Sequence, residues 1–297
     1  MPRYRDNTAL RPYKVSTTFF CLDAETHQPL CFLLASSAMT VTQITPRLLH
    51  LAARILNPPA ESKPLVVADN EHYTQELFHS VATETPFDLL VPMRNTRALT
   101  AALQAIPAQQ FQPRWAGWAT THRPFHFQQH PERTYCQLIQ RSGENSQSFH
   151  HKAFLASRYR DEVIDLAILY PQRWHVEEFF NAYQALGWKR AGTLNLHIRF
   201  GQLSMALLAQ TVCHQLRQRL GTPFAAWDAS HFASAIFRGL DGDIRVRDNT
   251  ILVTLYNAPQ PDLLKKHYEN LPHILERENV DPRIPWLYNF KLDFRFR

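Results

Sequence analysis

Two short apolar runs constrain the fold of this 297-residue chain more than any other feature. Residues 64–69 are apolar up to a final acid, Asp69, and residues 87–91 follow a helical stretch and are apolar except for Asp88. Apolar runs of this length are typical of strands that are buried on both faces. They predict the interior of a sheet covered by helices, with Asp69 at the carboxyl end of a central strand.

Strand and helix patterns alternate along the rest of the chain. Strands are expected at residues 14–22 and 29–35, and helices at residues 74–82, 98–106, 160–169, 171–186 and 196–220, with a further helix starting at Thr45. Residues 111–157 contain short strand-like pieces between polar breaks, which indicates a β-rich insertion. Residues 244–256 predict a hairpin, and residues 281–297 an irregular arm. This mixture predicts an α/β fold.

The same patterns suggest a division of the chain into parts. A basic leader is expected first, then a core in two parts that the insertion separates, and finally a hairpin with its tail. The boundaries we expect are residues 1–13, 14–110, 111–157, 158–240 and 241–297.

Composition narrows the classes of function. The chain has 32 Lys and Arg residues against 26 Asp and Glu residues, a net charge of +6, which favours an acidic partner such as nucleic acid. No apolar stretch is long enough to span a membrane. The four cysteines form no C-x-x-C pair, which is typical of free thiols in a cytosolic protein. The eight glycines form no phosphate-binding loop, which argues against nucleotide binding.

A polar stripe is expected on the helix near residue 177. At about 100° per residue, Tyr170, Arg173, Glu177 and Gln184 lie within about 60° of one another. One interpretation is a solvated face with an Arg–Glu pair. The other is a metal-binding carboxylate beside an arginine that contacts phosphate. Asp69 is equally open to two interpretations, as a helix cap or as a functional acid.

These residues resemble a known family. Tyr170, Arg173 and Glu177 are similar to the signature of DDE-type bacterial insertion-sequence transposases, in which Tyr, Arg, Glu and Lys follow at fixed spacing. The chain matches the first three positions and has Gln184 at the fourth. The strand before Asp69 resembles the one that carries the family's second catalytic Asp. The family also has a β-rich insertion between that Asp and the Glu, as residues 111–157 do here.

The resemblance implies a ribonuclease-H-like mixed sheet with flanking helices, interrupted by the β-rich insertion. It also implies two Mg²⁺ or Mn²⁺ ions held by two Asp and one Glu, with Asp69 and Glu177 as catalytic metal ligands. Two metals about 3.5–4 Å apart stabilise both the attacking and the leaving oxygen at phosphorus. Hard cations of this kind prefer carboxylate oxygen. The implied activity is DNA hydrolysis followed by strand transfer of an insertion sequence.

The implied partner is double-stranded DNA, both the transposon ends and the target, with a homodimer assembled on it. The expected location is the bacterial cytoplasm, at the nucleoid, with no membrane partner. The residues predicted to contact DNA are Tyr170, Arg173, Trp174, Gln184, Lys189 and Arg190.

The first catalytic Asp has two possible positions. Either Asp23 ends the first strand and is that acid, or residues 14–35 are the second and third strands and the first strand lies upstream of Met1. We favour the second, because Asp is common in turns. The chain would then lack the family's N-terminal region. A truncated, inactive remnant that still binds DNA is the alternative to an active transposase, and a non-transposing metal-dependent nuclease is a third hypothesis.

Overall fold

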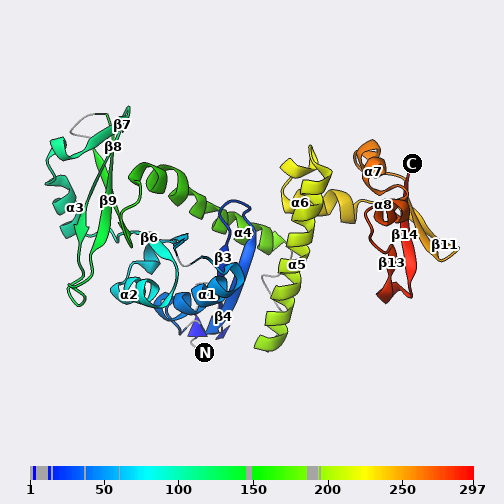
Figure 1. The fold of residues 1–297 in the computed structure, drawn as a ribbon, viewed down its shortest axis with the longest axis horizontal. Helices are drawn as coiled ribbons and strands as arrows, with labels where there is room; N and C mark the ends of the chain where they lie inside the picture. Colours follow the sequence, from blue (N-terminus) through cyan, green and yellow to red (C-terminus); the bar gives the residue numbers. More distant parts are fainter. Residues whose placement is uncertain are drawn as a thin grey trace. The chain divides into compact units, whose positions relative to one another are not determined.

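The computed structural model describes residues 3–4, 13–14, 16–36, 38–59, 61–144, 149–185, 193 and 195–297. The chain divides into two compact units, Met1–Phe180 and Asn181–Arg297, and Figure 1 labels many of their helices and strands. Within the described ranges, no helix is both long enough and apolar enough to cross a membrane.

In its described residues, the first unit contains ten strands. They are β1 Arg3–Tyr4, β2 Tyr13–Lys14, β3 Ser16–Leu22, β4 Pro29–Ser36, β5 Leu65–Val67, β6 Asp88–Pro92, β7 Gln112–Trp115, β8 Trp118–Phe125, β9 Tyr135–Ser142 and β10 His150–Ala156. Its helices are α1 Val41–Leu56, α2 Gln75–Glu84, α3 Arg97–Gln104 and α4 Trp174–Ala185, with 3-10 segments η1 Asn70–His72, η2 Ala108–Gln110 and η4 Tyr170–Arg173, and the π-helix η3 Ile164–Leu169.

Six strands form one mixed sheet in the order β5-β6-β10-β9-β8-β7. The pair β5–β6 is parallel and the other pairs are antiparallel. The strands of residues 111–157 therefore continue the sheet that begins with the two apolar runs. Mixed α/β architecture is confirmed.

The position of β5 differs from the sequence prediction. In the described part of the chain β5 pairs with β6 alone, so it is an edge strand and not a central one. Its three residues are half-buried, whereas all five residues of β6 are buried. The apolar run reflects packing on both faces, since Leu65 and Val67 contact one apolar cluster and Val66 another. Burial on the two faces does not determine whether both edges are paired.

The hairpin β3–β4 is a separate two-stranded sheet that shares a core with the larger one. Helix α1 contacts both of its strands and also α2. The ring of Phe20 on β3 packs edge-on against Phe179 at 4.8 Å and Phe180 at 5.3 Å between centroids. The hairpin is therefore in contact with helix α4.

Helix α1 begins earlier than predicted. It starts at Val41, not at Thr45-Pro46, and Pro46 lies inside it. The N–H of Thr40 donates to Oε1 of Gln43 at 3.0 Å, one half of a capping box. This cap lies five residues upstream of the predicted one, and Thr45 is buried within the helix.

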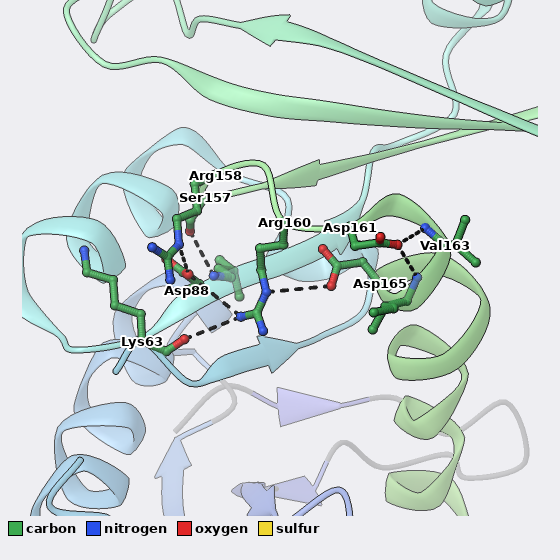
Figure 2. Close-up of polar contacts among 10 residues, drawn as sticks. Lys63, Asp88, Ser157, Arg158, Arg160, Asp161, Val163 and Asp165 are labelled. Carbon is green, nitrogen blue, oxygen red and sulfur yellow. Dashed lines mark hydrogen bonds and ion pairs between the residues drawn. The ribbon is translucent and has the colours of Figure 1, made fainter. Parts of the chain in front are cut away.

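A charged network lies where the sheet meets the helical segment that leads to α4 (Figure 2). Nε of Arg158 donates to Oδ2 of buried Asp88 at 2.6 Å. Arg160 lies between two acids, 3.9 Å from Oδ2 of Asp88 and 3.9 Å from Oδ1 of Asp165. Asp161 caps the helical segment through the N–H groups of Val163 and Ile164. Through its ion pairs with Asp165 and Asp88, Arg160 thus links the start of that helical segment to β6.

Asp165 has the least well compensated carboxylate of this network. It is 1% exposed, and neither of its carboxylate oxygens has a hydrogen-bond partner within the described residues. Burial raises the pKa of Asp165; Arg160 opposes this rise, while Asp161 and Asp88 add to it. Folding therefore favours the protonated acid, and this contribution to stability is lost as the pH rises through the raised pKa.

We expect Asp165→Asn to raise the free energy of unfolding by about 1 kcal/mol near pH 7, because it removes the penalty of a buried charge. Near pH 4 the gain should largely disappear. Asp88→Asn should lower the free energy of unfolding by about 1–3 kcal/mol, since Arg158 loses its charged acceptor. Urea unfolding at both pH values measures the differences, and equal midpoints for Asp165→Asn and the wild type near pH 7 would contradict the first expectation.

The second unit contains a helical part and a four-stranded sheet. Its elements are α5 Leu196–Leu220, η5 Phe224–Ala226, α6 Ala229–Ala233, the π-helix η6 Ser234–Arg238, β11 Gly242–Arg247, β12 Thr250–Leu255, α7 Pro261–Tyr268, α8 Leu271–Arg277, β13 Arg283–Ile284, η7 Pro285–Leu287 and β14 Phe290–Phe296. The long helix ends at Gly221 as predicted, with φ of 70°. The predicted hairpin is β11–β12, with Asp248 and Asn249 at positive φ in its turn.

The C-terminal tail is not an irregular arm, so that prediction was wrong. β14 pairs in parallel with β12 and antiparallel with β13. Phe296 is buried in an apolar cluster with Leu220, Phe224 and Leu264. Alternation of aromatic residues with charged ones in residues 290–296 is typical of a strand with one buried face.

Candidate active site

Asp69 follows β5 and caps the 3-10 helix η1. Its Oδ1 accepts a hydrogen bond from the N–H of Glu71 at 3.1 Å and lies 2.8 Å from Nδ1 of His72. The hydrogen bond with His72 lowers the pKa of Asp69, and the charge of Arg173 lowers it further, against the effect of burial. Asp69 is therefore ionised at neutral pH, and its side chain is 46% exposed. It is both a cap and an accessible carboxylate.

The segment that carries Tyr170, Arg173 and Glu177 is helical but changes its winding. It passes from the π-helix η3 through the 3-10 helix η4 into α4. Pro171 stands at the start of η4, where it has no N–H to donate to the preceding turn. With three residues per 3-10 turn, Tyr170 and Arg173 lie one above the other. The α-helical spacing assumed for residues 170–184 therefore does not hold in the first turn, although Arg173 and Glu177 lie within hydrogen-bond distance of each other.

Arg173 contacts one predicted metal ligand, Glu177, and interacts with the other, Asp69, through its charge. Its guanidinium donates to Oε1 of Glu177 at 2.9 Å and is 25% exposed. Burial acts to lower the pKa of Arg173, but Glu177, Tyr170 and Asp69 together raise it. The side chain is thus a cation shared by the acid that follows β5 and the acid on α4. Burial raises the pKa of Tyr170, which keeps the phenol neutral.

Lys152 on β10 belongs to the same cluster, and sequence reasoning missed it. Its Nζ lies 4.9 Å from the ring centroid of Phe154 and 5.2 Å from that of Tyr170, within cation–π range. Burial lowers the pKa of Lys152, and Arg173 lowers it further. Lys152 and Phe154 lie two residues apart and so share one face of β10, but this spacing alone does not mark a functional lysine.

The residues of this site lie in a segment that matches a known protein family. The model of the transposase DDE domain matches residues 13–212, which include Asp69, Lys152, Tyr170, Arg173 and Glu177. The chain belongs to the transposase DDE domain family. The family is one of polynucleotidyl transferases that generally use divalent metal.

Other comparisons add little to this DDE domain. Among solved structures, a piggyBac transposase synaptic complex with hairpin DNA matches at 12% identity and a TM-score of 0.35. That match covers 60% of this chain and 36% of the other, so the chain spans about a third of that protein's length. A TM-score this low carries no argument about fold or function. Comparison with curated proteins gives no match.

Asp23 lies in the turn of the β3–β4 hairpin of the DDE domain. Its Oδ1 accepts hydrogen bonds from the N–H and the hydroxyl of Thr26, both at 2.7 Å, and from the N–H of Glu25 at 3.2 Å. Burial acts to raise the pKa of Asp23, but these hydrogen bonds outweigh it and lower the pKa. This is the bonding of a turn-forming Asp. The same turn contacts α4, since the rings of His27 and His175 stack at 3.4 Å between centroids.

The other residues predicted to contact DNA are Trp174, Gln184, Lys189 and Arg190. Trp174 stands at the start of α4 and is 55% exposed. The side chain of Gln184 and all of Lys189 and Arg190 lie outside the described residues.

The donor chemistry of the site suits a hard divalent ion. Asp69 is ionised, and Asp69 and Glu177 offer carboxylate oxygens around one shared arginine. Among the described residues, neither Asp69 nor Glu177 belongs to a compact group of three metal-ligand side chains. The two carboxylates are therefore of the ligand type that such a metal prefers, but they do not by themselves complete its coordination shell.

Proposed function

We propose that this chain is the catalytic core of an insertion-sequence transposase of the Tyr/Arg/Glu/Lys group, which hydrolyses and rejoins DNA phosphodiester bonds. The observation that carries the proposal is the position of Arg173. It donates a hydrogen bond to Glu177 on the signature helix, and its charge contributes to lowering the pKa of Asp69, the acid after β5. The family match spans both segments.

Asp69 and Glu177 are the residues that would hold Mg²⁺ or Mn²⁺. When bound, such ions activate the attacking oxygen and stabilise the leaving oxygen at phosphorus. Arg173 neutralises part of the charge of both acids in their absence. Tyr170 and Arg173 would hold a backbone phosphate next to these carboxylates, and Lys152 would add a second cation. Trp174, Gln184, Lys189 and Arg190 stay proposed contacts to DNA.

For the first carboxylate we favour a strand that precedes β3 over Asp23. Asp23 uses Oδ1 for three bonds within its own turn. Within the described residues, β3 pairs only with β4 and β5 pairs only with β6, so each offers a free edge to a further strand. A strand between them would fit the ribonuclease-H-like order that the family resemblance implies. The five-part domain division, the homodimer on DNA and the nucleoid location belong to the same proposal.

A catalytically inactive remnant that binds DNA is the second candidate. The observation in its favour is that, among the described residues, no group of three metal-ligand side chains includes Asp69 or Glu177. Such a protein would keep Arg173, Lys152 and Tyr170 as a phosphate-binding cluster without completing the metal site. A non-transposing nuclease would need the acids but not this cluster.

Calorimetric titration of Mn²⁺ into the purified chain tests the site. Asp69→Asn should weaken Mn²⁺ binding by roughly 10–100-fold, because a ligand is lost. Asp23→Asn should stay within about twofold of the wild type, since that carboxylate serves its turn. Equal weakening by both substitutions would place Asp23 in the site. Absence of binding by the wild type would favour the inactive remnant.

A further inference from the structure

A second group of metal-binding side chains lies away from the proposed active site. His79 comes from α2, while His130 and Glu132 come from the loop between β8 and β9. One ligand atom of each residue lies within 4.8 Å of those of the other two. The two imidazoles stack at 3.9 Å between centroids with an interplanar angle of 14°. Nδ1 of His130 lies 3.4 Å from Oε1 of Glu132.

The loop is fixed to α2 by contacts outside this group. The ring of Phe127 packs against Phe78 at 5.9 Å and against Tyr135 at 5.3 Å. Nε2 of Gln75 donates to Oε1 of Gln129 at 2.6 Å. The three ligand-type side chains are therefore held together by the fold, and not only by one another. Preorganisation of this kind raises metal affinity.

His79 supplies an independent indication of a missing partner. Its Nδ1 is buried and has no hydrogen-bond partner within the described residues. Folding has removed this nitrogen from water without giving it a replacement contact, which natural proteins rarely tolerate. The neighbouring imidazole at stacking distance adds a second nitrogen donor.

We propose that His79, His130 and Glu132 bind one divalent transition-metal ion of the Zn²⁺ type. Two imidazoles and one carboxylate form a donor set typical of zinc, with a fourth position left to water. Imidazole ligands select against Mg²⁺, so this site differs in chemistry from the one at Asp69. The parallel rings must tilt for both nitrogens to face one ion. His130 is 31% exposed on a loop, which leaves room for this movement.

The role we assign to this ion is to fasten the β8–β9 loop to α2. The two segments are distant in sequence, and these three polar groups lie where they meet. Because the ion would bind only the folded arrangement, it should raise the temperature of unfolding as its concentration rises.

Zn²⁺ titration of the full chain by calorimetry, with Mg²⁺ in excess to occupy any hard-ion site, tests the proposal. We expect one Zn²⁺ site that His79→Ala and His130→Ala each weaken by at least about 10-fold. His273→Ala is the matched control, because His273 also lies 3.4 Å from a glutamate, Glu276. It should bind Zn²⁺ as the wild type does.

Further measurements separate loss of the site from loss of the fold. Glu132→Gln alters a side chain that is 64% exposed, so it should fold normally and still bind Zn²⁺ less tightly. Asp69→Asn should retain the Zn²⁺ site. The visible spectrum of bound Co²⁺ should show the intense bands of four-coordinate cobalt. Zn²⁺ affinity that is the same in the wild type, His79→Ala and His130→Ala would overturn the proposal, as would absence of Zn²⁺ binding by the wild type.

Discussion

Glu177→Gln is expected to lower Mn²⁺-dependent nicking of supercoiled plasmid DNA by roughly 10³-fold or more. Glu177 accepts a hydrogen bond from Arg173 and faces the cluster that includes Asp69. Glutamine keeps the shape and one oxygen but removes the charge that a divalent ion requires. The reaction should therefore fail although the helix is intact.

Glu178→Gln is the matched control for this substitution. Glu178 is the next residue on α4, and Oε2 of its carboxylate lies 2.7 Å from Nδ1 of His175, away from Arg173. We expect its nicking rate to stay within about threefold of the wild type, since an exposed ion pair contributes little. If both variants lost activity equally, general damage to α4 would explain the loss. If Glu177→Gln retained activity, the assignment of Glu177 would be wrong.

Local patterns predicted much of the fold, because helices and hairpins depend on neighbouring residues. The apolar periodicity and Gly221 located the long helix α5, and Asp248-Asn249 located the turn between β11 and β12. The edge position of β5 and the parallel pairing of β14 with β12 were not predictable in this way. Both depend on which strands meet in space, and an apolar run has the same appearance at an edge or in the centre when its two faces are covered.

The candidate site also has features that local sequence predicted and features that it did not. The spacing of Tyr170, Arg173 and Glu177 was sufficient to place them on one face, because that spacing is a property of helical winding. The charge interaction between Asp69 and Arg173 joins segments far apart in sequence, and only the resemblance to transposases suggested it. Lys152 was missed because a single lysine on a strand has no distinctive local pattern. Its position beside Tyr170 follows from the pairing of β10 within the sheet.

Arg173→Ala is expected to change the binding of metal and of DNA in opposite directions. In the wild type, the guanidinium of Arg173 is a cation shared by Glu177 and Asp69. Its removal leaves both carboxylates without this neutralising charge, so they should attract Mn²⁺ more strongly. We expect Mn²⁺ affinity to rise by up to roughly 5-fold, which corresponds to about 1 kcal/mol of interaction between charges at the surface.

The same substitution should weaken binding to a double-stranded oligonucleotide of arbitrary sequence by roughly 10–100-fold, because a charge-assisted contact to phosphate is lost. The dependence of log affinity on log salt concentration should decrease in slope by about 0.9, the value for one phosphate contact in duplex DNA. Fluorescence anisotropy over a range of salt concentrations measures both quantities. Lys265→Ala removes one positive charge from α7 and is the control for net charge.

Lys152→Ala distinguishes a phosphate contact from a cation that also neutralises the carboxylates. Lys152 contacts the Tyr170 ring and interacts electrostatically with Arg173, and neither Asp69 nor Glu177 is among the groups that shift its pKa. Its removal should therefore weaken DNA binding with a similar change in salt slope and leave Mn²⁺ affinity within about twofold of the wild type. If Arg173→Ala weakened Mn²⁺ binding as well, the guanidinium would be needed to orient Glu177. If neither variant changed DNA affinity, Tyr170, Arg173 and Lys152 would be a structural cluster and the phosphate-binding role would be wrong.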